Sequence, residues 1–410
     1  MEYITTYTGE NFTPHIPDAN QIKLEDIAHS LSLICRANGH FKRFYSVAQH
    51  CINCANEAKS RGMSARIQLA CLLHDGSEAY ISDITRPVKK HLPRYLEIEE
   101  ALQNTIYKKF LATPLTDEEC SLVKQVDNDM LVCEFNALMN KIIYDHVPII
   151  NSEPSFNERD YLAVKNMFLR LARNLMNGEK LVTALGIDGC HKGWCVVRLD
   201  SVGNSSMRLV QNIDGISAFD ADVAIIDIPI GLSDSGEERP FDKMVKERLG
   251  NRRNSVFPVP CREAVYESEC SYEKACEINK KITGKKISRQ SWAIIPKIHE
   301  VDLFLRDNPE MRKYLLESHP ELCFATLLGK PCEYHKRSQG GEKERIAFLR
   351  RHLDIISLFN NLQYSGDGAE ARRDDIIDAA VLAVAGFDAI EANNNHLIHN
   401  FIKYHHYKRK

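Results

Sequence analysis

The chain has 410 residues, more than one domain usually contains, so two domains are expected. Hydrophobic residues make up 44% and charged residues 27%, and the formal net charge is −3, so the composition indicates neither a membrane protein nor a general nucleic-acid binder. No apolar run is long enough to cross a bilayer, the start has no signal-peptide pattern, and 13 scattered cysteines favour reduced thiols in the cytoplasm.

Residues 21–177 show the apolar spacing of three and four that is typical of packed helices. The stretch "LEDIAHSLSLICRANG" begins with acids and ends on Gly39, as a capped helix does. Since strand-like alternation is absent, the N-terminal half, residues 1–180, is predicted to be an all-α helical bundle. Cys51 and Cys54 are interpreted as helix core, because no second pair completes a zinc site.

The stretch "CLLHDGSEAYISDITRPVK" places ionisable side chains directly behind an apolar run. If one helix continues through it, His74, Asp75 and Glu78 share a face. His50 on the preceding helix and Asp127 on a later one can join the same cavity. Four nitrogen and oxygen ligands from three helices suit Mn²⁺, Co²⁺ or Mg²⁺, and such an ion would lower the pKa of a bound water and hold a phosphoryl oxygen. The alternative is a bundle in which these side chains only form hydrogen bonds.

This spaced set resembles the H…HD…D signature of the HD-domain phosphohydrolases. "DIAHSLSLICRANGHFKRFYSVAQH", "LLHDGSEAYISDITRPVK" and "VKQVDNDMLVCEF" are each similar to the subgroup that contains bacterial 5′-deoxynucleotidases. The resemblance implies an HD-domain fold, one divalent metal ion, a nucleoside monophosphate substrate and a homodimer. Carried over by position, the metal ligands would be His50, His74, Asp75 and Asp127.

The same resemblance implies roles for other residues. Glu78 would handle the proton of the attacking water, and Asp83 would orient the water or the substrate. Arg36 and Lys89 would bind the substrate, with Arg36 at the phosphate. Those nucleotidases carry an aromatic residue next to the matching arginine that helps exclude ribonucleotides, whereas this chain has Ala37, so the sugar stays open. Hydrolysis of nucleoside triphosphates or cyclic nucleotides is the rival reading, because HD ligands alone do not fix the leaving group.

The pattern changes after Asn177 and Gly178. "ALGIDG" and "GWCVVRLD" are predicted to form a β-hairpin, "ADVAIIDIPIGL" a further buried strand, and "RRDDIIDAAVLAVAGFDAIEA" a helix near the end of the chain. Residues 181–410 are therefore predicted to form an α/β domain.

Four aspartates in this half form a second candidate site. Asp188 lies inside the first strand, Asp227 ends a later one, and Asp375 and Asp378 lie on one helical face. Carboxylates on central strands are costly to desolvate unless a cation pairs with them, and two Mg²⁺ ions that clamp a phosphodiester need such a cluster. In the alternative reading, the strand acids form turns and the helix acids complement the helix dipole.

This half also resembles a widespread family of uncharacterised proteins predicted to adopt a ribonuclease-H-like fold. The resemblance rests on "LGIDGCHKGWCVV", "DIPIGL", "SVFPVPCR", "HPELCFATLLG" and "DDIIDAAVLAVAG". It implies a nuclease, with Mg²⁺ or Mn²⁺ held by Asp188, Asp227, Asp375 and Asp378. Glu321 is a further acid in one of these motifs.

Residues 243–297 contain thirteen lysines and arginines against six acids, a local charge of +7. Together with Trp292, which is expected to be exposed and able to stack a base, this window predicts binding of RNA or DNA; a solvated helix face is the alternative. The tail "KYHHYKRK" is expected to be a mobile terminus. The whole chain is thus interpreted as a phosphohydrolase joined to a nuclease, or to a non-catalytic module that binds nucleic acid or nucleotide.

Overall fold

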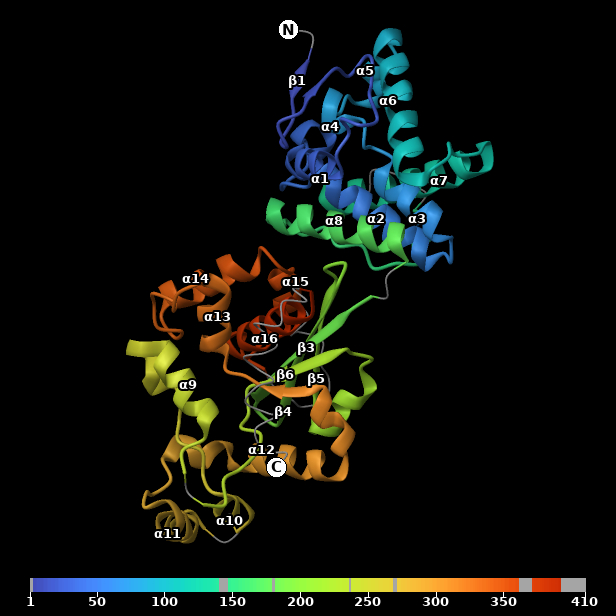
Figure 1. Cartoon of the computed structure of the whole chain (residues 1–410). Coiled ribbons are helices and arrows are strands. Elements are labelled where there is room, and N and C mark those ends of the chain that lie inside the picture. Colours follow the sequence, from blue (N-terminus) through green and yellow to red (C-terminus); the bar gives the residue numbers. More distant parts are fainter. Residues whose placement is uncertain are drawn as a thin grey trace. The chain divides into compact units, whose positions relative to one another are not determined.

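The computed structural model describes residues 3–139, 147–178, 181–235, 237–267, 271–360 and 371–391. The chain divides into two compact units (Figure 1). Unit 1 comprises Met1–Leu181 with the short segments Ser201–Gly203 and Arg350–His352, and unit 2 comprises the remainder. Among the described residues, no helix combines the length and apolar character needed to span a bilayer.

Unit 1 is a helical region, as predicted. Its helices are α1 (Leu24–Leu33), the 3-10 helix η1 (Arg36–Gly39), α2 (Val47–Ser60), α3 (Ala65–Leu73), α4 (Glu78–Ile81), α5 (Arg86–Lys89), α6 (Pro93–Leu111), α7 (Asp117–Leu138) and α8 (Tyr161–Asn177). A small antiparallel sheet of β1 (Ile4–Thr5) and β2 (Asn11–Phe12) precedes them, so the prediction of a purely α half is wrong at its start.

Two capping boxes fix where the site-bearing helices α2 and α7 begin. At α2, the Ser46 hydroxyl accepts a hydrogen bond from the backbone of Gln49, and the Gln49 side chain accepts one from the backbone of Ser46. Thr116 and Glu119 form the same reciprocal pair at the start of α7. Each box satisfies two backbone donors that a helix end otherwise leaves without partners, which sets the register of the residues that follow.

The helix predicted to carry His74, Asp75 and Glu78 on one face is in fact interrupted. α3 ends at Leu73 with His74 as its C-cap, and α4 begins at Glu78. Gly76 sits in the turn between them, where an added Cβ would lie 2.9 Å from the Leu73 carbonyl oxygen and 3.3 Å from the Ile106 side chain. A residue without a side chain therefore allows the chain to turn tightly against α6.

The first predicted helix also ends earlier than Gly39. α1 stops at Leu33, and Cys35 forms an isolated antiparallel bridge with Ser46. The Arg36 backbone nitrogen donates to the Tyr45 carbonyl oxygen at 2.9 Å. Arg36 therefore leaves the helix and enters a short turn instead, and Ala37, which follows it, adopts a left-handed conformation with φ 54°.

Unit 2 is built on a mixed five-stranded sheet, as an α/β prediction requires. Its strands are β3 (Thr183–Cys190), β4 (Gly193–Asp200), β5 (Ser205–Val210), β6 (Val223–Ile226) and β7 (Leu315–Glu317). Their order is β5-β4-β3-β6-β7. β3, β4 and β5 pair antiparallel, which confirms the predicted hairpin, whereas β3, β6 and β7 run parallel.

Helices cover both faces of this sheet (Figure 1). They are η2 (Ile213–Ala218), α9 (Pro240–Leu249), η3 (Gly250–Ser255), α10 (Arg262–Tyr266), α11 (Tyr272–Thr283), α12 (Arg289–Asp307), η4 (Pro309–Lys313), α13 (Pro320–Leu328), α14 (Gln339–Leu349), α15 (Ile355–Asn360) and α16 (Arg373–Glu391). One core packs α16 against Ala184 and Ile225, and the other packs α12 against Ile187 and Trp194. Side chains alternate between the two cores along β3, as they must on a pleated strand.

α16 approaches β3 most closely at Gly186. A Cβ added there would lie 1.9 Å from the Ala379 carbonyl oxygen and 2.3 Å from the Ala383 nitrogen. Backbone atoms cannot move aside as a flexible side chain can, so Gly186→Ala is expected to lower the free energy of unfolding by about 3 kcal/mol. Denaturant unfolding of the full chain measures this loss.

Gly386→Ala is the matched control for this prediction. Its added Cβ would meet only side chains, with the Ile225 Cγ1 atom nearest at 2.9 Å, and alanine is the better helix former. Equal unfolding midpoints for the two variants would contradict the described contact between α16 and β3.

Candidate functional site

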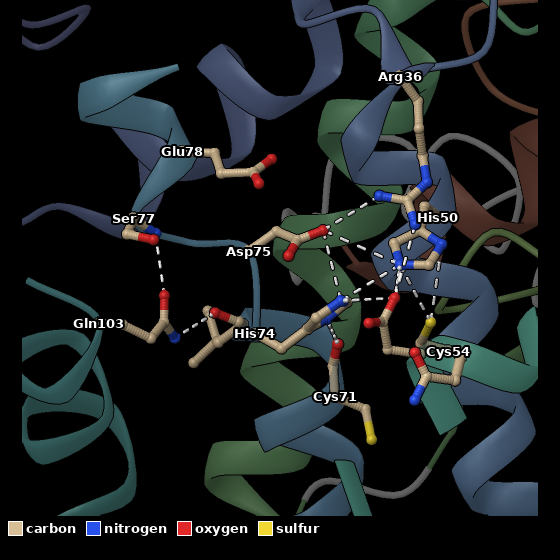
Figure 2. A network of polar contacts seen from close by, with 12 residues as sticks. Arg36, His50, Cys54, Cys71, His74, Asp75, Ser77, Glu78 and Gln103 are labelled. Carbon is tan, nitrogen blue, oxygen red and sulfur yellow. Dashed lines mark hydrogen bonds and ion pairs between the residues drawn. The ribbon is translucent and has the colours of Figure 1, made fainter. Parts of the chain in front are cut away.

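Four acceptor atoms from three parts of unit 1 converge on one point (Figure 2). The Nε2 atoms of His50 in α2 and His74 after α3 lie 3.2 Å apart. Asp127 of α7 places its Oδ1 3.2 Å from the His50 Nε2 and 3.7 Å from the His74 Nε2. Asp75 Oδ2 lies 3.3 Å from the His74 Nε2 and 3.9 Å from the His50 Nε2. The four predicted metal ligands therefore lie together.

Hydrogen bonds on the far side of each imidazole indicate which nitrogen carries the proton. The His50 Nδ1 lies 2.7 Å from a Glu134 carboxylate oxygen, and the His74 Nδ1 lies 2.7 Å from the Cys71 carbonyl oxygen. Both partners accept hydrogen bonds, so each Nδ1 is the donor, and Nε2 is the nitrogen that each ring can offer to a metal ion. The two Nε2 atoms lie 3.2 Å apart, so a shared proton or a metal ion can lie between them.

The spacing of these atoms fits a divalent cation. Ligands about 2.1 Å from one ion lie about 3.0–3.4 Å from each other in octahedral or tetrahedral geometry. Of the five separations that involve an imidazole nitrogen, three fall in this range, and the other two are 3.7 and 3.9 Å. The residues present therefore fit a metal ion such as Mn²⁺, Co²⁺ or Mg²⁺.

Two thiols lie beside the same imidazoles. His50, Cys54 and His74 form one group that could hold a metal, and Cys51, His74 and Asp75 form another. Both cysteines are buried in α2, as predicted, and burial raises the pKa of the Cys51 thiol to about 11. Because a protonated thiol is a poor ligand, we favour the two carboxylates, although a thiophilic ion would compete for the sulfurs.

Glu134 organises the site from behind and was not predicted from the sequence. It is fully buried and accepts hydrogen bonds from the Arg36 Nε at 2.9 Å and the Tyr45 hydroxyl at 2.8 Å, besides that from His50. Glu134 lies seven residues after Asp127 in α7, two turns along the same face. That spacing is the signal that could have identified it.

Arg36 is held by Glu134 and keeps its other nitrogens near the metal ligands. Its Nη1 lies 3.4 Å from Asp75 Oδ2 and its Nη2 lies 3.5 Å from Asp127 Oδ1. These two contacts are long compared with the 2.9 Å bond to Glu134, so the terminal donors can also reach an anion. Arg86, also missed in the sequence, donates to Asp127 Oδ2 at 2.6 Å.

Figure 2 shows the Glu78 carboxylate turned toward Asp75, and the charges of Asp83 and Lys89 also act on Glu78. Burial, then the negative charges of Asp75 and Asp83, raise the pKa of Glu78. Burial also raises the pKa of Asp83. The Lys89 Nζ lies 3.8 Å from Glu78 Oε1 and 2.6 Å from Glu99 Oε1. The Oε2 of Glu78 is buried and has no hydrogen-bond partner among the described residues.

In unit 2 the four predicted aspartates also gather. Asp227 directly follows β6, and its backbone nitrogen donates to Ile187 at 3.0 Å, which places it beside Asp188 on the adjacent parallel strand. α16 brings Asp378, which is buried, and Asp375 over this end of the sheet. Burial first, and then the charges of Asp378, Asp227 and Asp375, raise the pKa of Asp188 well above its usual value.

The alternative interpretation, in which the acids of α16 complement the helix dipole, also agrees with one contact. One oxygen of Asp375 accepts a hydrogen bond from the Arg372 backbone at 2.8 Å, as an acid at the start of a helix does. Glu321 is buried in an ion pair with Arg345 and lies 3.7 Å from Arg252, while its Oε2 has no hydrogen-bond partner among the described residues. Lys336, which was not predicted, contacts Asp378 Oδ2 at 2.7 Å.

The basic window shows one clear difference from the prediction. Trp292 is half-buried and packs edge-on against Tyr272, with ring centroids 5.4 Å apart, because it faces the core under α12. It is therefore not an exposed base-stacking platform. Five lysines of this window are exposed, as both nucleic-acid binding and a solvated helix face require: Lys243, Lys280, Lys281, Lys285 and Lys286. The tail "KYHHYKRK" lies outside the described residues.

A family model described as "Protein of unknown function (DUF429)" matches residues 186–397, more than half of the chain. The chain belongs to this family. The uncharacterized protein YfdR of Escherichia coli (strain K12) is 37% identical over 134 residues, which are 33% of this chain and 71% of YfdR. An uncharacterized protein of Rhodobacter capsulatus is 35% identical over 100 residues, 23% of this chain and 50% of that protein. The DUF429 match contains all four aspartates of unit 2 and leaves the site of unit 1 outside it.

Mn²⁺ is expected to stabilise the DUF429 part of the chain more at about pH 8 than at about pH 5.5. Burial raises the pKa of Asp188, Asp227 and Asp378 above the value of an unfolded aspartate. Without metal, the folded state therefore binds more protons than the unfolded state, and its stability falls as the pH rises from about 4 through the raised pKa values. A cation that pairs with the ionised carboxylates restores that stability at the higher pH.

Thermal unfolding of the full chain with and without Mn²⁺ at both pH values checks this expectation. The Asp188→Asn variant corrects for metal bound in unit 1, because it lacks only a carboxylate of unit 2. An equal Mn²⁺-induced shift at both pH values, or the same pH dependence in Asp188→Asn, would contradict it.

Proposed function

We propose that the chain is a metal-dependent phosphohydrolase whose unit 1 releases phosphate from nucleoside 5′-monophosphates. The observation that carries the proposal is the convergence of two imidazole Nε2 atoms and two carboxylate oxygens beside the cationic Arg36 and Lys89. Such a set suits a cation that itself binds a phosphate. The resemblance of the motifs to HD-domain nucleotidases supports the same reading and implies a homodimer.

The residues around the metal ligands divide the work of hydrolysis. A cation held by the two imidazoles and two carboxylates would lower the pKa of a bound water and polarise a phosphoryl oxygen. Arg36 and Lys89 donate to the phosphate oxygens. The unpartnered Oε2 of Glu78 accepts the proton of the attacking water. The raised pKa of Glu78 makes its carboxylate a stronger base for this step. Asp83 orients the water or the substrate.

For unit 2 we propose a ribonuclease-H-like fold with a nuclease site that uses Mg²⁺ or Mn²⁺. Its support is the placement of the buried Asp188 and Asp378 on β3 and α16, beside the partly buried Asp227 directly after β6. Ionised acids in such positions are costly unless a cation pairs with them. The exposed lysines of the basic window favour a nucleic-acid partner in either case. A module that binds RNA or DNA without cleaving it is the second candidate that those lysines support.

An assay of phosphate release with Mn²⁺, Co²⁺ or Mg²⁺ tests the proposal for unit 1. The substrates are ribo- and deoxynucleoside monophosphates, the corresponding triphosphates, and cyclic nucleotides. Asp75→Ala removes a metal ligand. Asp129→Ala is the matched control, because Asp129 lies on the same helix as Asp127 but contacts Arg61 at 2.9 Å. Turnover of monophosphates that is lost in Asp75→Ala and kept in Asp129→Ala supports the proposal and identifies the sugar. Turnover of triphosphates or cyclic nucleotides alone establishes the rival, and no turnover of any substrate overturns both.

A further inference from the structure

We infer that Lys336 is a resident cation of the carboxylate cluster in unit 2 and takes the place of a second divalent ion, so that the cluster binds one metal ion. The inference rests on the proposed metal site of unit 2 and changes its expected composition from two ions to one ion and a lysine. It also assigns Lys336 a ligand, a non-bridging oxygen of a phosphodiester.

The first support is the direct contact of Lys336 with the cluster. Its Nζ lies 2.7 Å from Asp378 Oδ2, on a carboxylate whose side chain is only 4% exposed. Burial raises the pKa of Asp188 and Asp227, and the positive charge of Lys336 opposes this effect at both, as that of His319 does at Asp227. Lys336 therefore lies within electrostatic reach of acids on α16, β3 and β6.

The second support is that the turn carrying Lys336 is fixed from both sides. Glu344 of α14 accepts hydrogen bonds from the backbone nitrogens of Glu333 at 2.8 Å and Tyr334 at 3.1 Å. Arg345, which is 1% exposed, donates to the Tyr334 carbonyl oxygen at 3.3 Å. A lysine that only solubilised the surface would not need a turn held by two side chains of the following helix.

Further contacts close the same turn. The Ser338 nitrogen donates to the His335 carbonyl oxygen at 2.9 Å, and the Gly341 nitrogen donates to the Ser338 hydroxyl at 3.0 Å. A Cβ on Gly341 would lie 2.0 Å from the His335 carbonyl oxygen, so α14 packs directly onto the turn. Arg345 also pairs with Glu321 of α13, which ties the turn to a second helix. The backbone that carries Lys336 is thus held in place by α13 and α14.

The positive charge of Lys336 favours one bound metal ion over two. In two-metal phosphoesterase sites the ions lie about 3.5–4 Å apart and share carboxylate ligands. An ammonium bound to Asp378 already occupies one of those carboxylate positions, and a second divalent ion beside it would be repelled. One divalent ion with Lys336 leaves the ammonium two further donors, which can reach a phosphate oxygen. In the alternative, Lys336 only neutralises the buried Asp378.

The number of Mn²⁺ ions bound by the full-length chain distinguishes one metal ion from two without an activity assay. Calorimetry and the loss of the free-ion electron paramagnetic resonance signal measure this number. The Asp75→Ala background weakens metal binding in unit 1, so that the ions counted belong mainly to unit 2. Lys336→Met removes the charge and keeps the length of the side chain, whereas Lys336→Arg keeps the charge. Lys343→Met, at an exposed position of α14, is the matched control. Circular dichroism confirms that each variant is folded.

The expected result is about one Mn²⁺ per chain in the Asp75→Ala background, in Lys336→Arg and in Lys343→Met, and about two in Lys336→Met. Two ions with Lys336 present would overturn the inference and leave the metal-dependent nuclease proposal intact. One ion both with and without Lys336 would also overturn it and make Lys336 a structural partner of Asp378. No bound Mn²⁺ in any variant would overturn both the inference and the proposed metal site.

Discussion

Glu78→Gln is expected to lower kcat for phosphate release by about 10²–10⁴-fold while Mn²⁺ remains bound. Glutamine has nearly the same shape but cannot accept a proton, so the change removes the proposed base without opening a cavity. The Glu78 side chain is 6% exposed, and its Oε2 has no hydrogen-bond partner among the residues that the structure describes, so this oxygen is not committed to a structural role. Steady-state kinetics at saturating metal, with a Mn²⁺ titration of the same protein, measure both effects.

Glu99→Gln is the control for this variant. Glu99 also pairs with Lys89, at 2.6 Å, and Glu78 lies 3.8 Å from the same nitrogen. Loss of a charged partner of Lys89 therefore affects both variants, whereas loss of the base affects only Glu78→Gln. A similar decrease in kcat for the two variants would show that the effect passes through Lys89 and would remove Glu78 from the mechanism.

Glu134→Ala is expected to lower the free energy of unfolding of unit 1 by about 3–5 kcal/mol. The substitution leaves the buried Arg36 guanidinium without its shortest ion pair, and it removes the acceptor of the Tyr45 hydroxyl and of His50. Because Glu134 also fixes the proton on the His50 Nδ1, the remaining folded protein should bind metal about 10–100-fold more weakly. Urea unfolding in the presence of a chelator gives the first quantity, and a metal titration gives the second.

Glu134→Gln separates the two roles of this residue. It keeps an acceptor oxygen in a side chain of the same size but loses the charge that pairs with Arg36. We expect a stability between those of the parent chain and Glu134→Ala. If Glu134→Ala unfolded at the same urea concentration as the parent chain, the buried network around Arg36 would contribute little to the stability of unit 1, contrary to this prediction.

Local spacing predicted which ionisable residues of unit 1 lie together, but not Glu134 behind them. The residues His74 and Asp75 follow an apolar run, and a polar pair in that position indicates a buried site. Glu134, by contrast, is one of several acids in α7, a helix that also carries Asp117, Glu118 and Glu119 in its exposed first turn. Nothing in one sequence distinguishes a buried glutamate from exposed ones until the helix face is known.

Backbone geometry was harder to predict than residue type. The turn at Gly76 breaks the predicted helix, yet the ionisable groups still meet, because the turn and α4 return Glu78 to the same side. In unit 2, the apolar stretch around Asp188 predicted a strand with this residue inside it, but not the contact of α16 with Gly186. A glycine inside a strand does signal a close backbone approach. Lys336 could not be predicted, because only the packing of α14 brings its turn to Asp378.

The proposed metal site of unit 1 requires that its four acceptors hold a divalent cation through two imidazoles. Pulsed electron paramagnetic resonance of the Mn²⁺-loaded full chain, labelled with ¹⁵N-histidine, detects such bonds. The Asp188→Asn background weakens metal binding in unit 2. We predict ¹⁵N coupling from two directly bound imidazoles, reduced to one in His50→Ala. Bound Mn²⁺ without imidazole coupling, or a spectrum unchanged by His50→Ala, would contradict the proposed site.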